Sequence, residues 1–154
     1  MTIEDDIAFL ERVPILHRLG TGALRILAIG AESYSVQAGQ LLFAAGDVAD
    51  CAYIVQQGTF DLYADQAREG AAVIGPGTLL GETALLSETL RPATATARED
   101  ATVVRISRTM FLKMLESYPD AAQRVRDLIA ERANQWASDM ERVRAVLARG
   151  TGPQ

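Results

Sequence analysis

Apolar side chains recur at helical spacing near both ends of this 154-residue chain and follow a strand-like pattern in between. Over residues 2–13 they form one stripe, and Asp5 and Asp6 lie in what would be the first turn of a helix, where acidic side chains are favoured. A second stripe covers residues 21–30 and ends at a glycine. The pattern therefore predicts two N-terminal helices.

From residue 34 the pattern changes to short apolar runs that are separated by glycine turns. The runs predict strands at residues 34–37, 41–44, 52–56, 60–64, 71–74, 93–97 and 102–106. Phe60 and Leu62 alternate with Asp61 and Tyr63, which is typical of a half-buried strand. Many short strands at this spacing predict a β-roll of the double-stranded β-helix or jelly-roll type.

Helical spacing returns at residues 108–117, and the Tyr118-Pro119 step then disfavours helical backbone. A long final helix is predicted over residues 120–148. Its apolar stripe consists of Val125, Ile129, Ala133, Trp136, Met140, Val143 and Leu147. A stripe of this length is too large to leave in water. We expect it to pair with a second copy of the chain; packing back onto the roll is the alternative.

The predicted fold is mainly β with flanking helices. Residues 1–118 form the β-roll with its N-terminal helices, residues 119–149 form a long C-terminal helix of the same domain, and residues 150–154 form a tail. A chain of this length and apolar content suffices for one packed core. The final helix would serve as a lid or as a dimerisation element.

Composition narrows the function classes. The formal net charge of −5 argues against direct DNA binding, which needs a basic face. Cys51 is the only cysteine and is expected to be a buried structural thiol, so no disulfide ties the fold. The acidic N-terminus and the lack of a long apolar run predict a cytoplasmic protein without a membrane span. His17, the only histidine, has no partners for a catalytic triad or metal site, so we expect no enzyme activity, catalytic residues, metal or cofactor.

The segment over residues 75–97 interrupts the strand series and carries the candidate chemistry. Gly81 opens a Leu- and Ala-rich run that can form one or two helical turns, whose first amides point outward at an anion. Glu82 can accept a hydrogen bond from a hydroxyl group. Arg91 supplies a planar cation that suits a phosphate. These groups together predict a ligand that carries both a phosphate and a sugar hydroxyl.

The segment resembles the phosphate-binding cassette of cyclic nucleotide-binding domains, which occur in catabolite activator protein, protein kinase A regulatory subunits and cyclic-nucleotide-gated channels. The family motif runs Gly-Glu-x-Ala-Leu, with an arginine ten residues after the glycine. The chain matches the motif at Gly81, Glu82, Ala84, Leu85 and Arg91. The resemblance extends over about residues 7 to 135, including the strand-and-turn pattern around Gly39, Gly46-Asp47 and Gly58.

The resemblance implies a role for each cassette residue. Glu82 would accept a hydrogen bond from the ribose 2′-hydroxyl, and Arg91 would pair with the exocyclic phosphate oxygens. The amides around Thr83 and Ala84 would add neutral donors to the phosphate. The base pocket is expected to include Val73 and Ile74.

Pro92 departs from the family pattern. Relatives place Ala, Ser or Thr there and donate its backbone N–H to the phosphate, whereas proline has no N–H. The missing donor predicts weakened binding. A threonine at this position assists guanine selection in some relatives, so Pro92 favours cAMP as the ligand over cGMP.

The leading hypothesis is a stand-alone cyclic nucleotide sensor that signals through its C-terminal helix to a second copy or an unidentified effector protein. The alternative is a family member that has lost its ligand and acts as a protein-interaction module. In that case Glu82 and Arg91 would form a salt bridge across an empty pocket.

Overall fold

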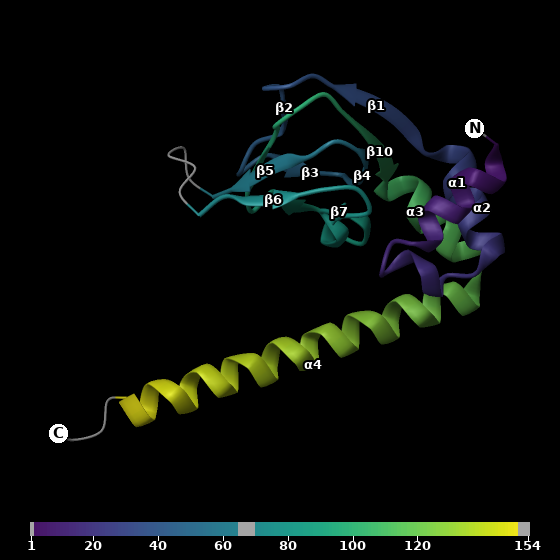
Figure 1. The fold of residues 1–154 in the computed structure, drawn as a ribbon. Helices are drawn as coiled ribbons and strands as arrows, with labels where there is room; N and C mark the ends of the chain where they lie inside the picture. Colours follow the sequence, from purple (N-terminus) through teal and green to yellow (C-terminus); the bar gives the residue numbers. More distant parts are fainter. Residues whose placement is uncertain (1, 65–69, 151–154) are drawn as a thin grey trace.

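A computed structural model describes residues 2–64 and 70–150 of the chain, with the side chains of residues 129, 132–140 and 148–150 outside the described set. The N-terminal helices are α1 (Ile3–Glu11), the 3₁₀ turn η1 (Leu16–Arg18) and α2 (Thr21–Gly30). The C-terminal helices are α3 (Arg108–Ser117) and α4 (Pro119–Gly150). A β-roll lies between them, so the predicted fold class is confirmed (Figure 1).

Helix α1 begins with a capping box. The Thr2 hydroxyl accepts from the Asp5 N–H, and the Asp5 carboxylate accepts from the Thr2 N–H, each at 3.2 Å. The hydrogen bond from the Thr2 backbone holds the pKa of Asp5 below its ordinary value. The prediction of a helix through residue 13 was too long, because Pro14 disfavours helical backbone at the residue before it.

The strands form two four-stranded antiparallel sheets and one short ribbon. The first sheet has the order β1-β10-β4-β7, with β1 (Glu32–Val36), β10 (Ala101–Ser107), β4 (Cys51–Gln57) and β7 (Leu79–Leu80). The second has the order β2-β9-β5-β6, with β2 (Leu41–Phe43), β9 (Thr94–Ala97), β5 (Phe60–Tyr63) and β6 (Ala72–Ile74). The ribbon pairs β3 (Val48–Ala49) with β8 (Thr89–Leu90). The end of the predicted strand at residues 60–64 adjoins residues 65–69, which lie outside the described residues.

The central strands β4 and β10 are buried on both faces. One face of each strand, with Val55 and Val103, packs inside the roll. The other face, with Ile54 and Ile106, packs against the helices. This double burial explains why residues 52–55 read as a continuous apolar run and not as an alternating one.

The cassette is anchored in both cores. Leu80 of β7 packs inside the roll, whereas Leu85 of η2 (Glu82–Leu85) packs in the helical core with Phe111 of α3. The predicted helical turn is therefore present, as a short 3₁₀ helix. The strands β3, β7 and β8 were not predicted, because two-residue strands carry no periodicity of their own.

Helix α4 starts at the helical end of the molecule and runs outward below the roll (Figure 1). Ala121 and Val125 are buried against the helical core, and Arg124 Nη1 donates to the Leu19 carbonyl at 3.3 Å. Farther along, Arg18 and Glu131 form an exposed ion pair at 3.3 Å. These contacts dock the first part of α4 on the N-terminal helices.

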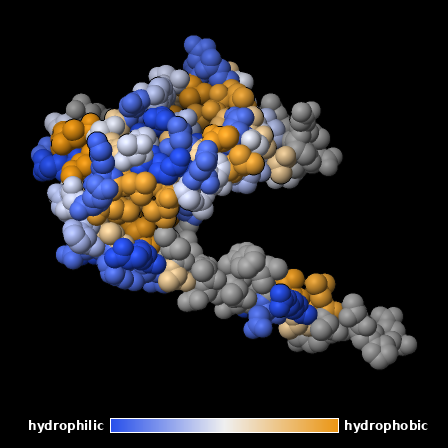
Figure 2. Space-filling model, turned by 180° about the vertical axis from the view of Figure 1, so that it is seen from behind, coloured by the Kyte–Doolittle hydropathy of each residue, from blue (hydrophilic) through white to orange (hydrophobic). Residues whose placement is uncertain are grey.

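The C-terminal part of the predicted stripe is not packed on the roll. Val143 is 48% exposed and Leu147 is 60% exposed. Figure 2 shows an apolar area beside hydrophilic residues on this part of α4. The side chains of Ile129, Ala133, Trp136 and Met140, like residues 151–154 of the predicted tail, lie outside the described residues.

Gly58, in the turn between β4 and β5, is expected to tolerate no side chain. Its φ is +85°, and an added Cβ would lie 2.7 Å from the Asp100 carbonyl oxygen. Gly39 has nearly the same φ, +86°, but open space around it. Left-handed backbone costs about 1–2 kcal/mol for an L residue, and overpacking adds about 1–3 kcal/mol. Urea unfolding should therefore show a larger loss for Gly58→Ala than for Gly39→Ala; equal losses would contradict the packing of this turn.

Candidate functional site

A pocket of about 410 Å³ opens between the cassette and the roll. Its walls come from β2, β5, β7, the start of η2 and the segment that leads into β9. The lining residues are Phe43, Leu62, Leu79, Leu80, Gly81, Glu82, Thr83, Arg91, Pro92 and Ala93. Five of the eight residues predicted for the site, Gly81, Glu82, Thr83, Arg91 and Pro92, line it.

The floor of the pocket follows from the strand register. Ala95 of β9 is directly opposite Phe43 on β2 and also opposite Leu62 on β5. Paired residues point to the same face of a sheet, so the small Ala95 lies between two large apolar side chains. Ala93, two residues earlier, also lines the pocket. The alternation of Ala and Thr over residues 93–97 thus leaves room for a ligand above the second sheet.

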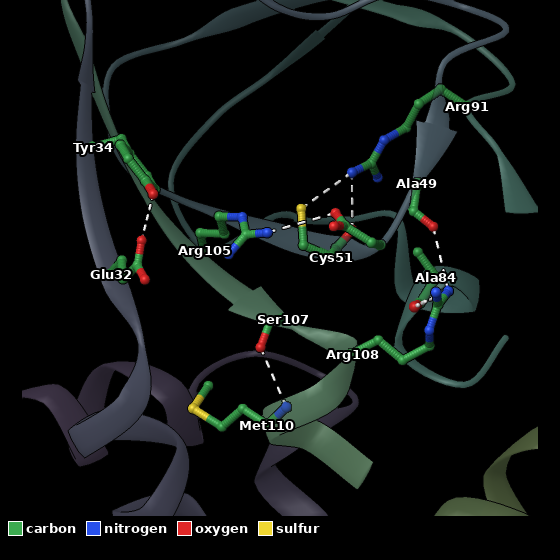
Figure 3. Close-up of polar contacts among 11 residues, drawn as sticks. Glu32, Tyr34, Ala49, Cys51, Ala84, Arg91, Arg105, Ser107, Arg108 and Met110 are labelled. Carbon is green, nitrogen blue, oxygen red and sulfur yellow. Dashed lines mark hydrogen bonds and ion pairs between the residues drawn. The ribbon is translucent and has the colours of Figure 1, made fainter. Parts of the chain in front are cut away.

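Arg91 is the central polar residue of this site and is only 5% exposed. Its Nη2 donates to the Cys51 carbonyl oxygen at 2.9 Å and lies 3.3 Å from Cys51 Sγ (Figure 3). The guanidinium carbon lies 4.5 Å from the ring centroid of Phe43 and 5.5 Å from that of Tyr53. Among the described residues it forms no ion pair with a carboxylate. A buried cation is thus held by neutral groups.

The second terminal nitrogen of Arg91 is left without a partner. Among the buried side-chain nitrogen and oxygen atoms of the described residues, Nη1 is the one without a hydrogen-bond partner. A Cβ at Gly81 would overlap Nη1, and Gly81 has φ +81°, so glycine meets two requirements here. An unsatisfied buried donor costs about 1–3 kcal/mol, more when charged. The site therefore holds a donor that an oxyanion would satisfy.

Glu82, half-buried, lines the same pocket as Arg91. The two side chains do not pair: the ion pairs among the described residues do not include Arg91, whose hydrogen bonds go to Cys51. The expected alternative of a Glu82–Arg91 salt bridge is therefore wrong for this structure. A carboxylate oxygen accepts hydrogen bonds, so Glu82 can orient a hydroxyl group of a ligand whose anionic group is at Arg91.

Ala84 does not offer the donor that was predicted. Its N–H donates to the Gly81 carbonyl at 3.0 Å, which closes the 3₁₀ turn, and its side chain is fully buried. Thr83 is exposed on the pocket wall. Only the beginning of η2 is therefore in a position to face a ligand.

Val73 and Ile74 do not line this pocket. Val73 is 55% exposed on β6, and Ile74 packs against the core of the roll. The prediction placed the base pocket at Val73 and Ile74, whereas the apolar wall of this pocket lies on other strands. The wall is formed instead by Phe43 of β2 and Leu62 of β5, which both lie opposite Ala95 of β9. The register of the strands places them there, and no motif in the sequence marks them.

Pro92 is exposed at the pocket rim, and its missing N–H leaves the sheet intact. The backbone pairing at this point runs through Arg91, whose N–H donates to the Asp47 carbonyl and whose carbonyl accepts from the Gly46 N–H, both at 2.8 Å. Strand β9 begins only at Thr94. Proline is thus tolerated by the fold, and its effect is confined to the pocket.

A larger cavity of about 660 Å³ adjoins this site and shares Leu79 and Glu82 with it. It lies between residues 12–15 and the turn at residues 76–78. Its cationic lining residue is the exposed Arg12, whereas Arg91 lines the smaller pocket. We therefore place the anion site in the smaller pocket, since a buried cation interacts more strongly with an anion than an exposed one does.

The described residues offer neither a metal site nor a membrane span. No three His, Cys, Asp or Glu side chains among them come together as metal ligands. None of the helices described is long and apolar enough to cross a membrane. Cys51 is a buried free thiol, as predicted.

Comparison with solved structures shows relatives of this fold. A cyclic nucleotide-binding-like protein from Brucella abortus is 41% identical, with a TM-score of 0.64 over 73% of this chain and 98% of that one. The regulatory domain of Toxoplasma gondii PKA, crystallised with cAMP, is 25% identical, with a TM-score of 0.67 over 79% of this chain and 46% of that one.

Among curated sequences, a lysophospholipase of Neurospora crassa is 30% identical over 115 residues, which are 73% of this chain but 8% of the lysophospholipase. The chain thus spans only a small part of that relative. Residues 34–118, which include the whole cassette, match the family described as the cyclic nucleotide-binding domain. The chain belongs to the cyclic nucleotide-binding domain family.

Proposed function

We propose that this chain is a regulatory module that binds a cyclic nucleotide, with cAMP as its ligand. The observation that carries the proposal is the buried, unpartnered Nη1 of Arg91 in a pocket of about 410 Å³. That volume falls within the range of roughly 300–1,000 Å³ for small-molecule sites. The exocyclic oxygens of a nucleotide phosphate are the acceptors that this donor lacks.

The charges in the pocket support a cyclic phosphate over a free monophosphate. A cyclic phosphodiester carries one negative charge, which Arg91 balances, whereas a 5′-monophosphate carries close to two near neutral pH. Glu82 lines the same pocket and repels the second charge. Glu82 would also accept a hydrogen bond from the ribose 2′-hydroxyl, which selects a ribonucleotide.

The choice of cAMP over cGMP rests on Pro92, which lines the pocket. Proline has neither a hydroxyl group nor an N–H that could hydrogen-bond to guanine. The chain therefore lacks at this position a polar group for guanine recognition, and adenine is favoured.

Calorimetry with cAMP tests the proposal directly. Arg91→Met replaces the buried cation by an apolar chain of similar length, a change that a buried site often tolerates in the fold. We expect the wild type to bind cAMP more tightly than 5′-AMP or 2′-deoxy-cAMP, and Arg91→Met to lose about 1.5–3 kcal/mol of binding free energy, the value of a hydrogen bond to a charged group. Arg98→Met, at a half-exposed arginine outside the pocket, is the control and should bind normally. No heat and no thermal shift at millimolar cAMP would instead favour an interaction module that has lost its ligand.

Pro92→Ala is expected to tighten cAMP binding. The variant restores a backbone N–H at the pocket rim, and a hydrogen bond to a charged acceptor is worth about 1.5–3 kcal/mol, or roughly tenfold to more than a hundredfold in Kd. Pro14→Ala, at an exposed proline that does not line this pocket, should leave Kd unchanged. Unchanged affinity in Pro92→Ala would show that the phosphate does not reach residue 92.

We further propose that α4 transmits the binding signal and pairs with α4 of a second copy. Val143 and Leu147 are about half exposed, and they continue the stripe whose first part packs on the helical core. The pairing of such stripes would remove apolar surface from water. Helix α4 contacts α3, and α3 contacts η2 of the cassette. A ligand at the cassette could therefore act on α4 through α3.

Val143→Lys is expected to weaken this pairing, because it puts a charge into the apolar stripe. Sedimentation of the full chain should show a dimer for the wild type and a shift towards monomer for Val143→Lys. Arg144→Gln, at the next residue and on a different face of the helix, should stay dimeric. A wild type that sediments as a monomer at all concentrations would contradict the pairing and leave the ligand proposal unaffected.

A further inference from the structure

The buried charge of Arg91 needs a source of stabilisation. The residue is only 5% exposed, and the ion pairs among the described residues do not include it. The carbonyl oxygen and the sulfur atom of Cys51 both accept from Nη2, and neither accepts a hydrogen bond from Nη1. A buried cation without a counter-charge is unfavourable unless other groups stabilise it.

Two aromatic rings provide that stabilisation. The guanidinium carbon lies 4.5 Å from the centroid of Phe43 and 5.5 Å from the centroid of Tyr53, both within the ~6 Å range of a cation–π interaction. The two rings stack on each other, with centroids 6.0 Å apart and planes at 21°. Burial raises the pKa of Tyr53 to about 12, so its hydroxyl group stays neutral at physiological pH.

The rings belong to different sheets. Phe43 is on β2 of the second sheet and Tyr53 is on β4 of the first. Phe43 is nearly buried in the roll core, and Tyr53 packs against the same core. The position of the guanidinium is therefore set by the packing between the sheets.

We infer that Phe43 and Tyr53 are positioning residues that hold the guanidinium of Arg91 in place of a carboxylate, and thereby leave Nη1 without a competing acceptor, so that its hydrogen bonds remain for an oxyanion. A carboxylate partner would occupy the terminal nitrogens and compete with a phosphate for them. The faces of aromatic rings stabilise the cation without accepting its in-plane N–H groups. Nη1 thus stays beside Gly81, where it has no hydrogen-bond partner among the described residues.

The role in ligand binding rests on the proposed function, so the first test uses no ligand. Urea unfolding of Phe43→Leu, Arg91→Met and the double variant gives the coupling between ring and guanidinium. We expect the unfolding equilibrium constants to depart from additivity by roughly fivefold to thirtyfold, as for a desolvated cation–π pair. Phe60→Leu combined with Arg91→Met is the matched control, since Phe60 is a buried aromatic residue of the same core without a ring contact to Arg91. This pair should be additive within about twofold.

The second test measures cAMP affinity by calorimetry. Phe43→Leu should raise Kd by roughly fivefold to thirtyfold, and Phe43→Tyr, which keeps the ring face, should restore Kd to within about threefold of the wild type. If Phe43 served only as an apolar wall of the pocket, its replacement would raise Kd without coupling to Arg91 in the unfolding measurements.

The outcomes separate the two proposals. We call the contact of Phe43 and Tyr53 with the Arg91 guanidinium the aromatic clamp. Additive unfolding free energies for Phe43 and Arg91 would overturn the aromatic clamp, whatever the affinity for cAMP. An Arg91 coupling together with no cAMP binding by the wild type would support the clamp and reject cAMP as the ligand. Coupling with unchanged Kd in Phe43→Leu would overturn the positioning role in binding.

Discussion

The double burial of β4 and β10 is the constraint on which the rest of this structure depends. Each strand places one face in the core of the roll and the other in the core formed with the helices. The two cores therefore cannot be formed independently, and the helices at both ends of the chain are fixed to the roll through the same two strands. Any element that contacts both cores is held at their junction, and the cassette is such an element, through Leu80 and Leu85.

The anion site follows from this junction. Cys51 is the first residue of β4, and its carbonyl oxygen accepts a hydrogen bond from the side chain of Arg91. Arg91 belongs to the cassette and directly follows β8. Phe43 and Tyr53 bring one ring from each sheet to the same guanidinium. Arg91 Nη1 can lie close to the backbone of Gly81 because glycine has no Cβ. The result is a cation whose position is fixed by the fold, which would lower the ordering cost of binding the proposed ligand.

The cassette also contacts the elements that lead to α4. Leu85 packs with Phe111 and Met114 of α3, and Arg108 Nη1 lies 3.4 Å from both the Ala84 and the Ala49 carbonyl oxygens (Figure 3). Helix α4 follows α3 after a single residue, Tyr118, which packs against the helical core. Side chains of η2, α3 and the start of α4 therefore belong to one core, whereas Val143, farther along α4, is about half exposed.

The sequence by itself determined the helices, most strands and the identity of the cassette, because these depend on local periodicity, on glycine turns and on a contiguous motif. The match of α2 and α3 to their predicted bounds shows how much local spacing specifies. Only the tertiary structure decided the walls of the pocket and the state of Arg91. Phe43, Cys51 and Tyr53 lie 38 to 48 residues from Arg91 in the chain, and the packing of the two sheets, which no local pattern encodes, brings them to it.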